Sequence, residues 1–281
     1  MADGGPVRLF LAADRAVFRH IPAVLNSARA VTSRPLEVGV VVHRVAEPER
    51  AALAAKLPEV RFAFFESDQA RLAGLKVKRN LSPLTFARLL MPDLVDWDRY
   101  VYLDVDLLIL RDLGALQDTP LDGHPAAAVR SGGDGPINGG VLVVDAALWR
   151  ARGLGAQMLD YARRHSPKEA DQDSIEAVIG AEILPLDPRW NRLVDTVWGP
   201  PVADPEALLR EAWILHFITG FKPWNLGCWR IPAPLTAAWA RHADGRGLPR
   251  DWPAEARMLV WQLAMLAKER RPGWLGGAGK P

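Results

Sequence analysis

The sequence predicts an α/β fold in which a single, mostly parallel sheet is flanked by helices and followed by a helical C-terminal tail. In the first half of the chain, short apolar runs alternate with stretches of helical periodicity, as in a parallel sheet covered by helices. The run at residues 36–42 is nearly all apolar, as expected for a strand buried on both faces. The 281 residues, 49% hydrophobic and 24% charged, are enough for one large globular domain.

The elements of the first half follow one another in strand–helix order. Strands are predicted at residues 7–12, 36–42, 60–65 and 100–106, and helices at residues 17–31, 48–57 and 83–90. Pro48 and Pro83 stand at the first helical positions, where a missing N–H costs nothing, and Ser82 is a suitable N-cap. Residues 66–81 are expected to form a loop.

The second half continues with shorter strands and longer helices. Strands are predicted at residues 107–110, 126–129, 141–144, 183–186 and 213–217, and helices at residues 145–164, 171–179 and 254–271. The proline-rich stretches at residues 199–205 and 231–234 are expected to be surface loops. We therefore expect a main domain at residues 1–230 and a helical C-terminal extension at residues 231–281.

Composition excludes several classes of protein. A net charge of +2 is too close to neutral to indicate a nucleic-acid partner. The single cysteine rules out a disulfide framework within the chain and fits a reducing compartment. Residues 1–7 lack a secretory signal pattern, and no run approaches the ~20 apolar residues that span a bilayer. We expect a cytoplasmic protein.

The helix predicted at residues 254–271 is amphipathic, and several tryptophans surround it in the sequence. Such a helix either contacts anionic lipid on the inner face of the membrane or packs on the domain. The sequence leaves both alternatives open.

Two carboxylates end the strand predicted at residues 100–106. Asp104 and Asp106 are spaced i and i+2, which places both on the same side of an extended chain. Two close carboxylates repel one another unless a positive charge lies between them, and a hard divalent cation prefers oxygen ligands. The alternative is a strand end with two solvated turn aspartates.

Other candidate residues occur near predicted strand ends. Asp14 ends the first strand, where open α/β sheets bind ligands, although it could equally cap a helix. Arg88 projects from a short helix, where an arginine is usually solvated. Asn138-Gly139-Gly140 indicates either a close passage of the backbone beside a ligand or a hairpin turn.

The final candidates lie on a helix and on the last strand. Asp171 and Gln172 open a helix, where acidic residues are also favoured by the helix dipole alone. His216 stands among apolar strand residues, as a core histidine or as a metal ligand. It precedes a Gly/Lys/Pro/Trp loop that contains Gly220 and Lys222.

Taken in chain order, these segments resemble glycosyltransferase family 8. This family comprises retaining nucleotide-sugar transferases of the Rossmann-like GT-A fold, including bacterial lipopolysaccharide galactosyl- and glucosyltransferases and the glycogenins. The order of the blocks is far more specific than any one triplet. The matching blocks are LAAD (11–14), LTFARLL (84–90), YVYLDVDLLILRDL (100–113), INGGVLVVDAALWR (137–150), DQD (171–173) and HFITGFKPWN (216–225).

The resemblance implies a role for each matched residue. Asp104, Asp106 and His216 would bind Mn²⁺, or Mg²⁺, which bridges the diphosphate of a UDP-sugar. The catalytic residues around the donor sugar would be Arg88, Asp171 and Gln172. Residues 1–230 would form the nucleotide-sugar transferase domain. Donor contacts would come from Asp14 at the uracil, Lys222 at the diphosphate, and also Ala12, Asp104, Val105, Asn138, Gly139 and Gly220.

The resemblance also implies the reaction. We expect a hexose, galactose or glucose, to pass from UDP to a saccharide or lipid-linked saccharide acceptor in lipopolysaccharide or polysaccharide biosynthesis. Gln172 is an amide and a poor nucleophile, so a front-face displacement is expected rather than the covalent intermediate of retaining glycosidases. Arg130 stands where the family commonly has an aspartate near the sugar.

Two other functions are compatible with an α/β fold of this kind. A sugar nucleotidyltransferase would normally carry a glycine-rich, basic loop after the first strand, and residues 12–15 lack one. A non-catalytic nucleotide-sugar-binding protein would be expected to have lost one of the matched residues, yet Asp104, Asp106, His216 and Lys222 are all present.

Overall fold

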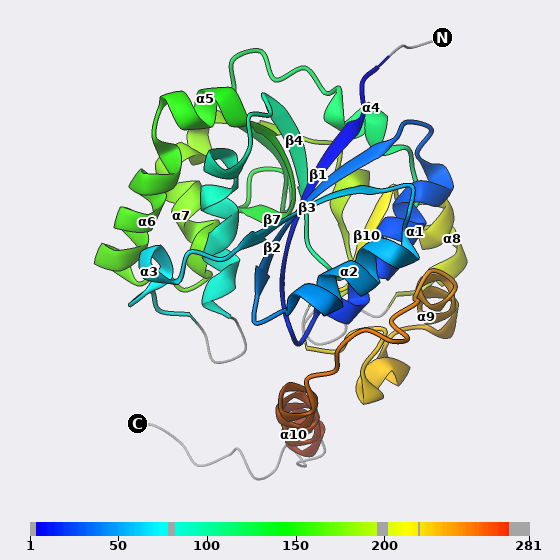
Figure 1. The fold of residues 1–281 in the computed structure, drawn as a ribbon. Helices are drawn as coiled ribbons and strands as arrows, with labels where there is room; N and C mark the ends of the chain where they lie inside the picture. The colour runs from blue at the N-terminus through cyan, green and yellow to red at the C-terminus, as the bar shows by residue number, and fades with distance from the viewer. Residues whose placement is uncertain (1–3, 78–81, 196–201, 219, 270–281) are drawn as a thin grey trace.

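A computed structural model describes residues 4–77, 82–195, 202–218 and 220–269. Its central sheet has seven strands in the order β3-β2-β1-β4-β7-β6-β8 (Figure 1). All neighbours are parallel except β7, which is antiparallel to both β4 and β6. The predicted mostly parallel sheet is therefore confirmed. Its strands are β1 (Val7–Asp14), β2 (Leu36–His43), β3 (Arg61–Glu66), β4 (Arg99–Leu103), β6 (Ala126–Arg130), β7 (Ile137–Asp145) and β8 (Ile183–Pro185).

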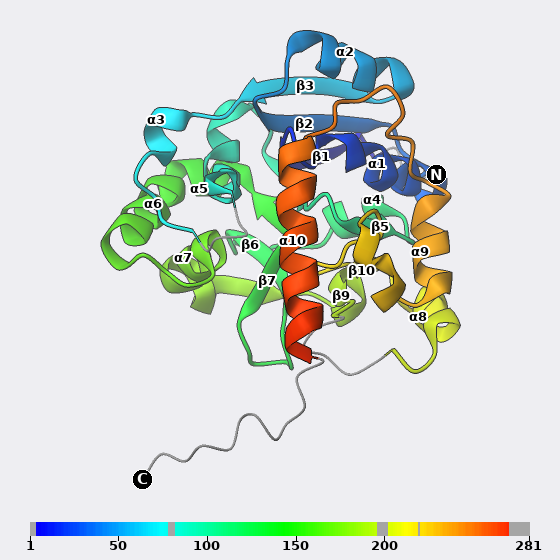
Figure 2. The same cartoon turned by 90° about the horizontal axis from the view of Figure 1, so that it is seen from below.

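Helices cover both faces of this sheet. Successive side chains of β1 point to opposite faces, so β1 contributes to the core on each side. Leu9 and Leu11 belong to a core cluster with α1 (Ile21–Val31) and α2 (Glu47–Lys56), whereas Phe10 belongs to a cluster on the opposite face. The second cluster includes residues of the 3₁₀ helix η2 (Pro83–Leu94), α5 (Ala146–Ala151), α6 (Leu154–His165) and α7 (Ala170–Ile179). Figures 1 and 2 show these two layers on either side of the strands.

A second, three-stranded sheet lies beside the first and was not predicted. Its order is β5-β10-β9, with β5 (Leu107–Ile109) antiparallel and β9 (Arg192–Leu193) parallel to the central β10 (Ile214–His216). In this register His216 lies opposite Leu107, the residue after Asp106. The small sheet therefore brings two distant segments of the sequence together.

Several predicted bounds were wrong. Strand β4 ends at Leu103, so Asp104 and Asp106 lie in the turn before β5 and not on the strand. The helix predicted at 145–164 is two helices, broken at Gly153, whose φ of 61° is left-handed. The short helix α3 (Gln69–Leu72) lies in the segment expected to be a loop.

The C-terminal region is mainly helical as far as residue 269, where the described residues end, as predicted. The proline-rich segment expected to be a loop opens α9 (Ala233–Ala240), because Pro234 is tolerated in a first turn. The long helix α10 (Trp252–Glu269) runs across the molecule in the view of Figure 2. The other elements are η1 (Phe18–His20), α4 (Leu113–Gln117), η3 (Gly180–Glu182), η4 (Pro188–Asn191), α8 (Pro205–Glu211) and η5 (Leu226–Arg230).

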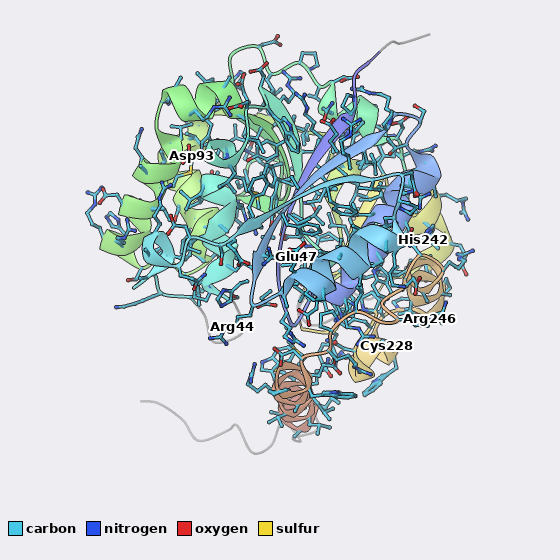
Figure 3. The ribbon with its side chains drawn as sticks, in the orientation of Figure 1. Arg44, Glu47, Asp93, Cys228, His242 and Arg246 are labelled. Carbon is cyan, nitrogen blue, oxygen red and sulfur yellow. The ribbon has the colours of Figure 1, made fainter. Side chains whose placement is uncertain are left out.

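The segment between α9 and α10 is bound to the main domain. The backbone carbonyl of His242 accepts a hydrogen bond from Asn26 on α1, and Asp244 pairs with Lys56 on α2 at 3.0 Å. Figure 3 labels His242 and Arg246 of this segment. The domain boundary at residue 230 stays a prediction. Among the described residues, no helix is both long enough and apolar enough to cross a bilayer.

Candidate active site

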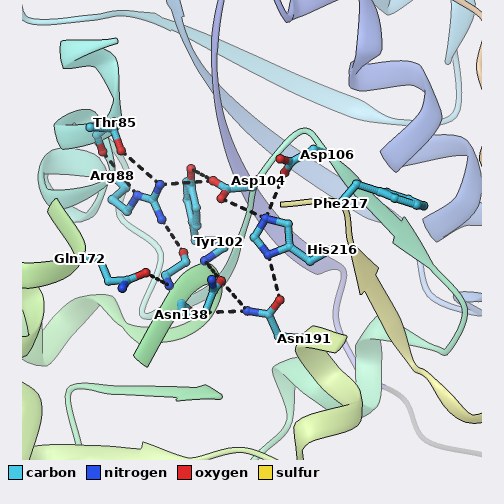
Figure 4. Close-up of polar contacts among 12 residues, drawn as sticks. Thr85, Arg88, Tyr102, Asp104, Asp106, Asn138, Gln172, Asn191, His216 and Phe217 are labelled. Atoms are coloured by element: carbon cyan, nitrogen blue, oxygen red, sulfur yellow. Dashed lines mark hydrogen bonds and ion pairs between the residues drawn. The ribbon is translucent and has the colours of Figure 1, made fainter. Parts of the chain in front are cut away.

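The turn after β4 brings three candidate ligands together. The N–H of Asp104 donates to the carbonyl of Gly140 on β7 at 2.9 Å, and the carbonyl of Asp106 accepts from the N–H of Phe217 at 3.0 Å. One ligand atom from each of Asp104, Asp106 and His216 lies within 4.8 Å of the others (Figure 4). The predicted convergence is found, but backbone hydrogen bonds to β7 and Phe217 produce it rather than alternation along a strand.

His216 is buried, with 4% of its surface exposed, yet its ring is not enclosed by apolar atoms alone. Its Nε2 lies 3.2 Å from Asp106 Oδ1 and 3.7 Å from Asp104 Oδ2. On the other side of the ring, Nδ1 lies 2.9 Å from Asn191 Oδ1. The histidine therefore presents one nitrogen to the carboxylates and the other to an amide.

Lys222 lies against the same carboxylates. Its Nζ is 2.5 Å from Asp106 Oδ2 and 2.5 Å from the carbonyl oxygen of Phe217. Burial alone would raise the pKa of Asp106, but the adjacent Lys222 ammonium holds that pKa well below its usual range. Asp106 is thus an anion at neutral pH, which is the state that a cation site requires.

The Oδ1 atom of Asp106 tests whether a cation fits here. It is buried, and it accepts no hydrogen bond from any residue that the structure describes. A buried carboxylate oxygen in this state is costly unless a positive charge satisfies it. Two carboxylates and one imidazole form a donor set suited to a divalent metal ion such as Mn²⁺. The residues present therefore fit a metal ion.

Arg88 is buried rather than solvated. Its Nε lies 2.7 Å from Asp171 Oδ2 and its Nη2 lies 3.2 Å from Asp104 Oδ1. Its guanidinium carbon is 4.4 Å from the centre of the Tyr102 ring, and its Nη1 donates to the carbonyl of Gly139. Burial would lower the pKa of Arg88, but the carboxylate of Asp171 leads the interactions that raise it. Arg88 is a permanent cation that links Asp171 to the Asp104 turn.

Asp171 faces the interior rather than capping its helix. Its carboxylate accepts a hydrogen bond from the hydroxyl of Thr85, and it pairs with Arg88. Burial raises the pKa of Asp171, and the charge of Arg88 opposes this shift. Capping contacts at this helix come instead from Asp173, which accepts from the N–H of Glu169 at 2.8 Å. The dipole alternative therefore explains Asp173 and not Asp171.

The Asn138-Gly139-Gly140 segment lies inside β7, so the hairpin-turn alternative is wrong. A β-carbon on Gly139 would lie 2.9 Å from Arg88 Nη1, and one on Gly140 would lie 2.7 Å from His216 Nδ1. Both glycines thus make room for a site residue. The N–H of Gly139 donates to Gln172 Oε1 at 3.2 Å, which brings Gln172 to the same strand.

The remaining candidates lie around this group without joining it. Asp14 accepts a hydrogen bond from the N–H of Ala16 at 3.0 Å, so it does cap a turn, and burial raises its pKa. Ala12 lies two residues earlier on β1, and Val105 packs partly buried against the core. Gly220 accepts a hydrogen bond from Gln262 Nε2 of α10 at 3.0 Å. No hydrogen bond between described residues joins Asp14 to the three candidate ligands.

Arg130 makes contacts within the protein. It pairs with Glu176 of α7 at 2.9 Å and donates to the carbonyl of Gly135 at 3.1 Å. Its charge is therefore neutralised within the protein.

Sequence reasoning missed three contributors. Tyr102 donates its hydroxyl hydrogen to Asp104 Oδ1 at 2.6 Å, Thr85 binds Asp171, and Asn191 contacts His216. The position of Tyr102 two residues before Asp104 was a usable signal. Asn191 gave none, because its contact with residue 216 depends on the pairing of β9 and β10.

The chain is similar in sequence to a known family of transferases. A family model described as "Glycosyl transferase family 8" matches residues 8–227. General stress protein A of Bacillus subtilis (strain 168) is 25% identical over 195 residues, covering 59% of this chain and 68% of that protein. Glycosyltransferase GlyA of Streptococcus pneumoniae serotype 4 is 30% identical over 156 residues, covering 53% of this chain and 22% of that protein. The chain thus matches under a quarter of GlyA.

Solved structures share the fold. A crystal structure of the galactosyltransferase LgtC, in complex with donor and acceptor sugar analogues, superposes with a TM-score of 0.72 at 21% identity. The match covers 89% of this chain and 100% of that chain. The glycosyltransferase GlyE of Streptococcus pneumoniae TIGR4 gives a TM-score of 0.69 at 21% identity, covering 93% of this chain and 64% of that chain. The predicted GT-A architecture is confirmed by these neighbours.

Proposed function

The chain belongs to glycosyltransferase family 8, and from this premise we propose that it transfers a hexose from a UDP-sugar to a saccharide or lipid-linked saccharide acceptor. Membership of the family makes the protein a glycosyltransferase. The hexose, the metal dependence and a role in lipopolysaccharide or polysaccharide assembly are the proposed part.

The observation that carries the proposal is the group formed by Asp104, Asp106 and His216. The buried Asp106 Oδ1 has no hydrogen-bond donor among the described residues, and three potential ligand atoms surround the same point. A bound divalent cation would stabilise the negative charge that develops on a departing diphosphate. The imidazole favours Mn²⁺ over Mg²⁺, because Mg²⁺ prefers oxygen ligands alone.

Lys222 is proposed to bind the diphosphate. Its ammonium lies on Asp106 at 2.5 Å, so it borders the point on which the three ligands converge. When UDP is bound, the ammonium would turn from Asp106 toward the phosphate oxygens, which offer a stronger negative field.

Retention of configuration is proposed to follow a front-face path. Asp171 is buried and engaged by Thr85 and Arg88, so it is poorly suited to attack a sugar. Gln172 has an amide oxygen that already accepts from Gly139. In this path the departing diphosphate takes the proton of the acceptor hydroxyl, and Gln172 orients the donor. A Gln172→Glu variant that accumulated a covalent glycosyl adduct and turned over faster would contradict it.

A peripheral membrane contact through α10 is also proposed. Trp252, Val260 and Leu263 are exposed to 63%, 67% and 54%, and their spacing places Val260 and Leu263 on one face of the helix. An exposed apolar stripe of this kind is typical of a helix that lies on a lipid surface.

Calorimetry with UDP, with and without Mn²⁺, tests the proposed function. We expect UDP to bind at least 10-fold more tightly with Mn²⁺, and we expect Asp104→Asn and Asp106→Asn to abolish this difference. Asp160→Asn serves as the control, because Asp160 is exposed and paired only on the surface of α6. UDP release from UDP-glucose and UDP-galactose, with water as default acceptor, then identifies the donor sugar.

Two outcomes would overturn the proposal. UDP binding that is absent, or that is equal with and without Mn²⁺, contradicts the metal-dependent transferase. Release of pyrophosphate from UTP and a sugar 1-phosphate would favour the sugar nucleotidyltransferase alternative.

A further inference from the structure

A chain of hydrogen bonds fixes the orientation of two side-chain amides behind the three candidate ligands. It begins at the backbone N–H of Gly140, which can only donate. This N–H lies 3.0 Å from Asn138 Oδ1, so the carbonyl oxygen of the Asn138 side chain must face it. Asn191 Nδ2 lies 2.8 Å from the same Oδ1 and 3.3 Å from the backbone carbonyl oxygen of Asn138. Because both neighbours are acceptors, the nitrogen of Asn191 must point toward them.

The orientation of Asn191 then fixes the ring of His216. With its nitrogen toward Asn138, Asn191 presents Oδ1 to His216 Nδ1 at 2.9 Å. A carbonyl oxygen only accepts, so Nδ1 carries the hydrogen. In the neutral ring Nε2 then has a free electron pair, and it is Nε2 that lies 3.2 Å from Asp106 Oδ1. Figure 4 shows this chain from Asn138 through Asn191 to the ring.

We propose that Asn191 is a positioning residue that holds His216 in the tautomer whose Nε2 binds the divalent cation. The proposal rests on the proposed function for the cation, but the tautomer itself does not. Metal-binding histidines commonly donate their second N–H to a fixed acceptor, and loss of that acceptor typically costs 10- to 100-fold in metal affinity. Asn191 is 2% exposed, so solvent does not supply a substitute acceptor.

A purely structural role for Asn191 predicts different behaviour from a positioning role. The Nδ2 group of Asn191 donates to Asn138 on β7, and a structural role would depend on this bond. The Oδ1 atom of Asn191 contacts the His216 ring, and a positioning role would depend on this contact. Asn191→Asp keeps an acceptor toward Nδ1 and loses the donor. Asn191→Leu loses both at similar volume. Asn26→Leu is the matched control, because Asn26 donates to a backbone carbonyl far from these ligands.

The experiment has two readouts. The first is ¹⁵N NMR of the histidine rings in metal-free protein, at a pH where the rings are neutral, with His216→Gln to assign the signal. We expect the hydrogen on Nδ1 in the unmodified protein and in Asn191→Asp, and a mixture of tautomers in Asn191→Leu. The second is Mn²⁺ affinity, measured by calorimetry in the presence of UDP. We expect a loss of at least 10-fold in Asn191→Leu, less than about 3-fold in Asn191→Asp, and none in Asn26→Leu.

Several results would overturn the proposal. A hydrogen on Nε2 in the unmodified protein contradicts the tautomer, and this measurement stands even where Asn191→Leu does not fold. Equal losses of Mn²⁺ affinity in Asn191→Leu and Asn191→Asp would indicate a structural role through Asn138. A ring with hydrogen on Nδ1 in a protein that binds no Mn²⁺ would overturn the proposed function, and with it the role of Asn191 toward the cation.

Discussion

The ring of His216 lies directly against the backbone of Gly140. A β-carbon at residue 140 would lie 2.7 Å from Nδ1 of that ring and closer still to Cε1. It would also lie 3.0 Å from Asp104 Oδ2. Only a glycine at this place in β7 leaves room for the histidine and the turn aspartate to meet.

The first prediction follows from this contact. Gly140→Ala should displace the His216 ring, since a β-carbon never approaches an aromatic atom so closely without a shift. We expect Mn²⁺ affinity in the presence of UDP to fall at least 10-fold, measured by calorimetry. Gly5→Ala, at a position with open space around it, should leave affinity unchanged. Unchanged Mn²⁺ binding in Gly140→Ala would show that the ring is not a ligand.

Lys222 and a metal ion are expected to compete for Asp106. The ammonium lies 2.5 Å from Asp106 Oδ2, so Lys222→Met removes a positive charge from the place where a cation would bind. We expect Lys222→Met to bind Mn²⁺ alone more tightly, by roughly 3-fold or more, and to bind UDP at least 10-fold more weakly. Titrations of Mn²⁺ alone and of UDP at saturating Mn²⁺ separate the two effects. Weaker binding of Mn²⁺ alone would contradict the competition.

The buried pair of Arg88 and Asp171 is expected to matter for folding. Arg88→Met leaves the carboxylate of Asp171 buried without its cation, which should lower the free energy of unfolding by about 3 kcal/mol. Adding Asp171→Asn to Arg88→Met should recover part of this loss, because the amide carries no charge. Denaturant unfolding measures both.

The surface pair of Arg164 and Asp160 provides the control for this prediction. Both side chains are more than half exposed, and Arg164→Met should change the free energy of unfolding by less than about 0.5 kcal/mol. If Arg88→Met changed the free energy of unfolding as little as Arg164→Met, the buried pair would not be stabilising.

His20 predicts a pH dependence of stability. Its ring stacks on Trp224 with centroids 4.1 Å apart, and burial lowers its pKa to about 3. The folded protein therefore favours the neutral ring. The contribution of His20 to stability is fully present above the ordinary pKa near 6.5 and is lost as the pH falls toward 3. When the pH falls from 7.5 to 5, the free energy of unfolding should decrease by about 1–2 kcal/mol less in His20→Phe than in the unmodified protein. Denaturant unfolding at the two pH values measures this.

His165 offers a matched comparison. Its ring stacks on Tyr161 with centroids 4.2 Å apart, but it is exposed on α6. His165→Phe therefore controls for the replacement of a stacked histidine by phenylalanine at an exposed position. Equal pH dependence in His20→Phe and in the unmodified protein would contradict the role of His20.

The two faces of α10 should separate by function. The inner face contacts Gly220, two residues before Lys222. Gln262 donates to the carbonyl of Gly220, and a β-carbon on Gly220 would lie 2.7 Å from Cη2 of Trp261. Trp261→Ala should therefore weaken UDP binding several-fold. Val260→Ser with Leu263→Ser, on the exposed face, should leave UDP binding unchanged and reduce pelleting with anionic vesicles. The opposite pattern would contradict the assignment of the faces.

Much of the fold was predictable because it depends on local patterns. Apolar runs bounded by turn residues located β1, β2 and β3, and Ser82-Pro83 located the start of η2, where Ser82 accepts from the N–H of Leu84. The break at Gly153 was missed, because apolar periodicity continues across it in sequence while the chain turns. Strands were predicted where β5 and β10 lie, but their pairing into a second sheet with β9 was missed, because pairing between distant segments leaves no local pattern.

The sequence by itself determined the fold class, the family resemblance and the identity of Asp104, Asp106, His216 and Lys222 as candidates, since all of these depend on residue types in chain order. Only the tertiary structure decided how they meet. Asp104 and Asp106 converge because backbone hydrogen bonds hold their turn against β7 and Phe217, and His216 faces them because β10 pairs with β5. The orienting contact of Asn191 likewise exists only once β9 lies beside β10. Such contacts join residues 25 to more than 100 positions apart, and no local pattern encodes them.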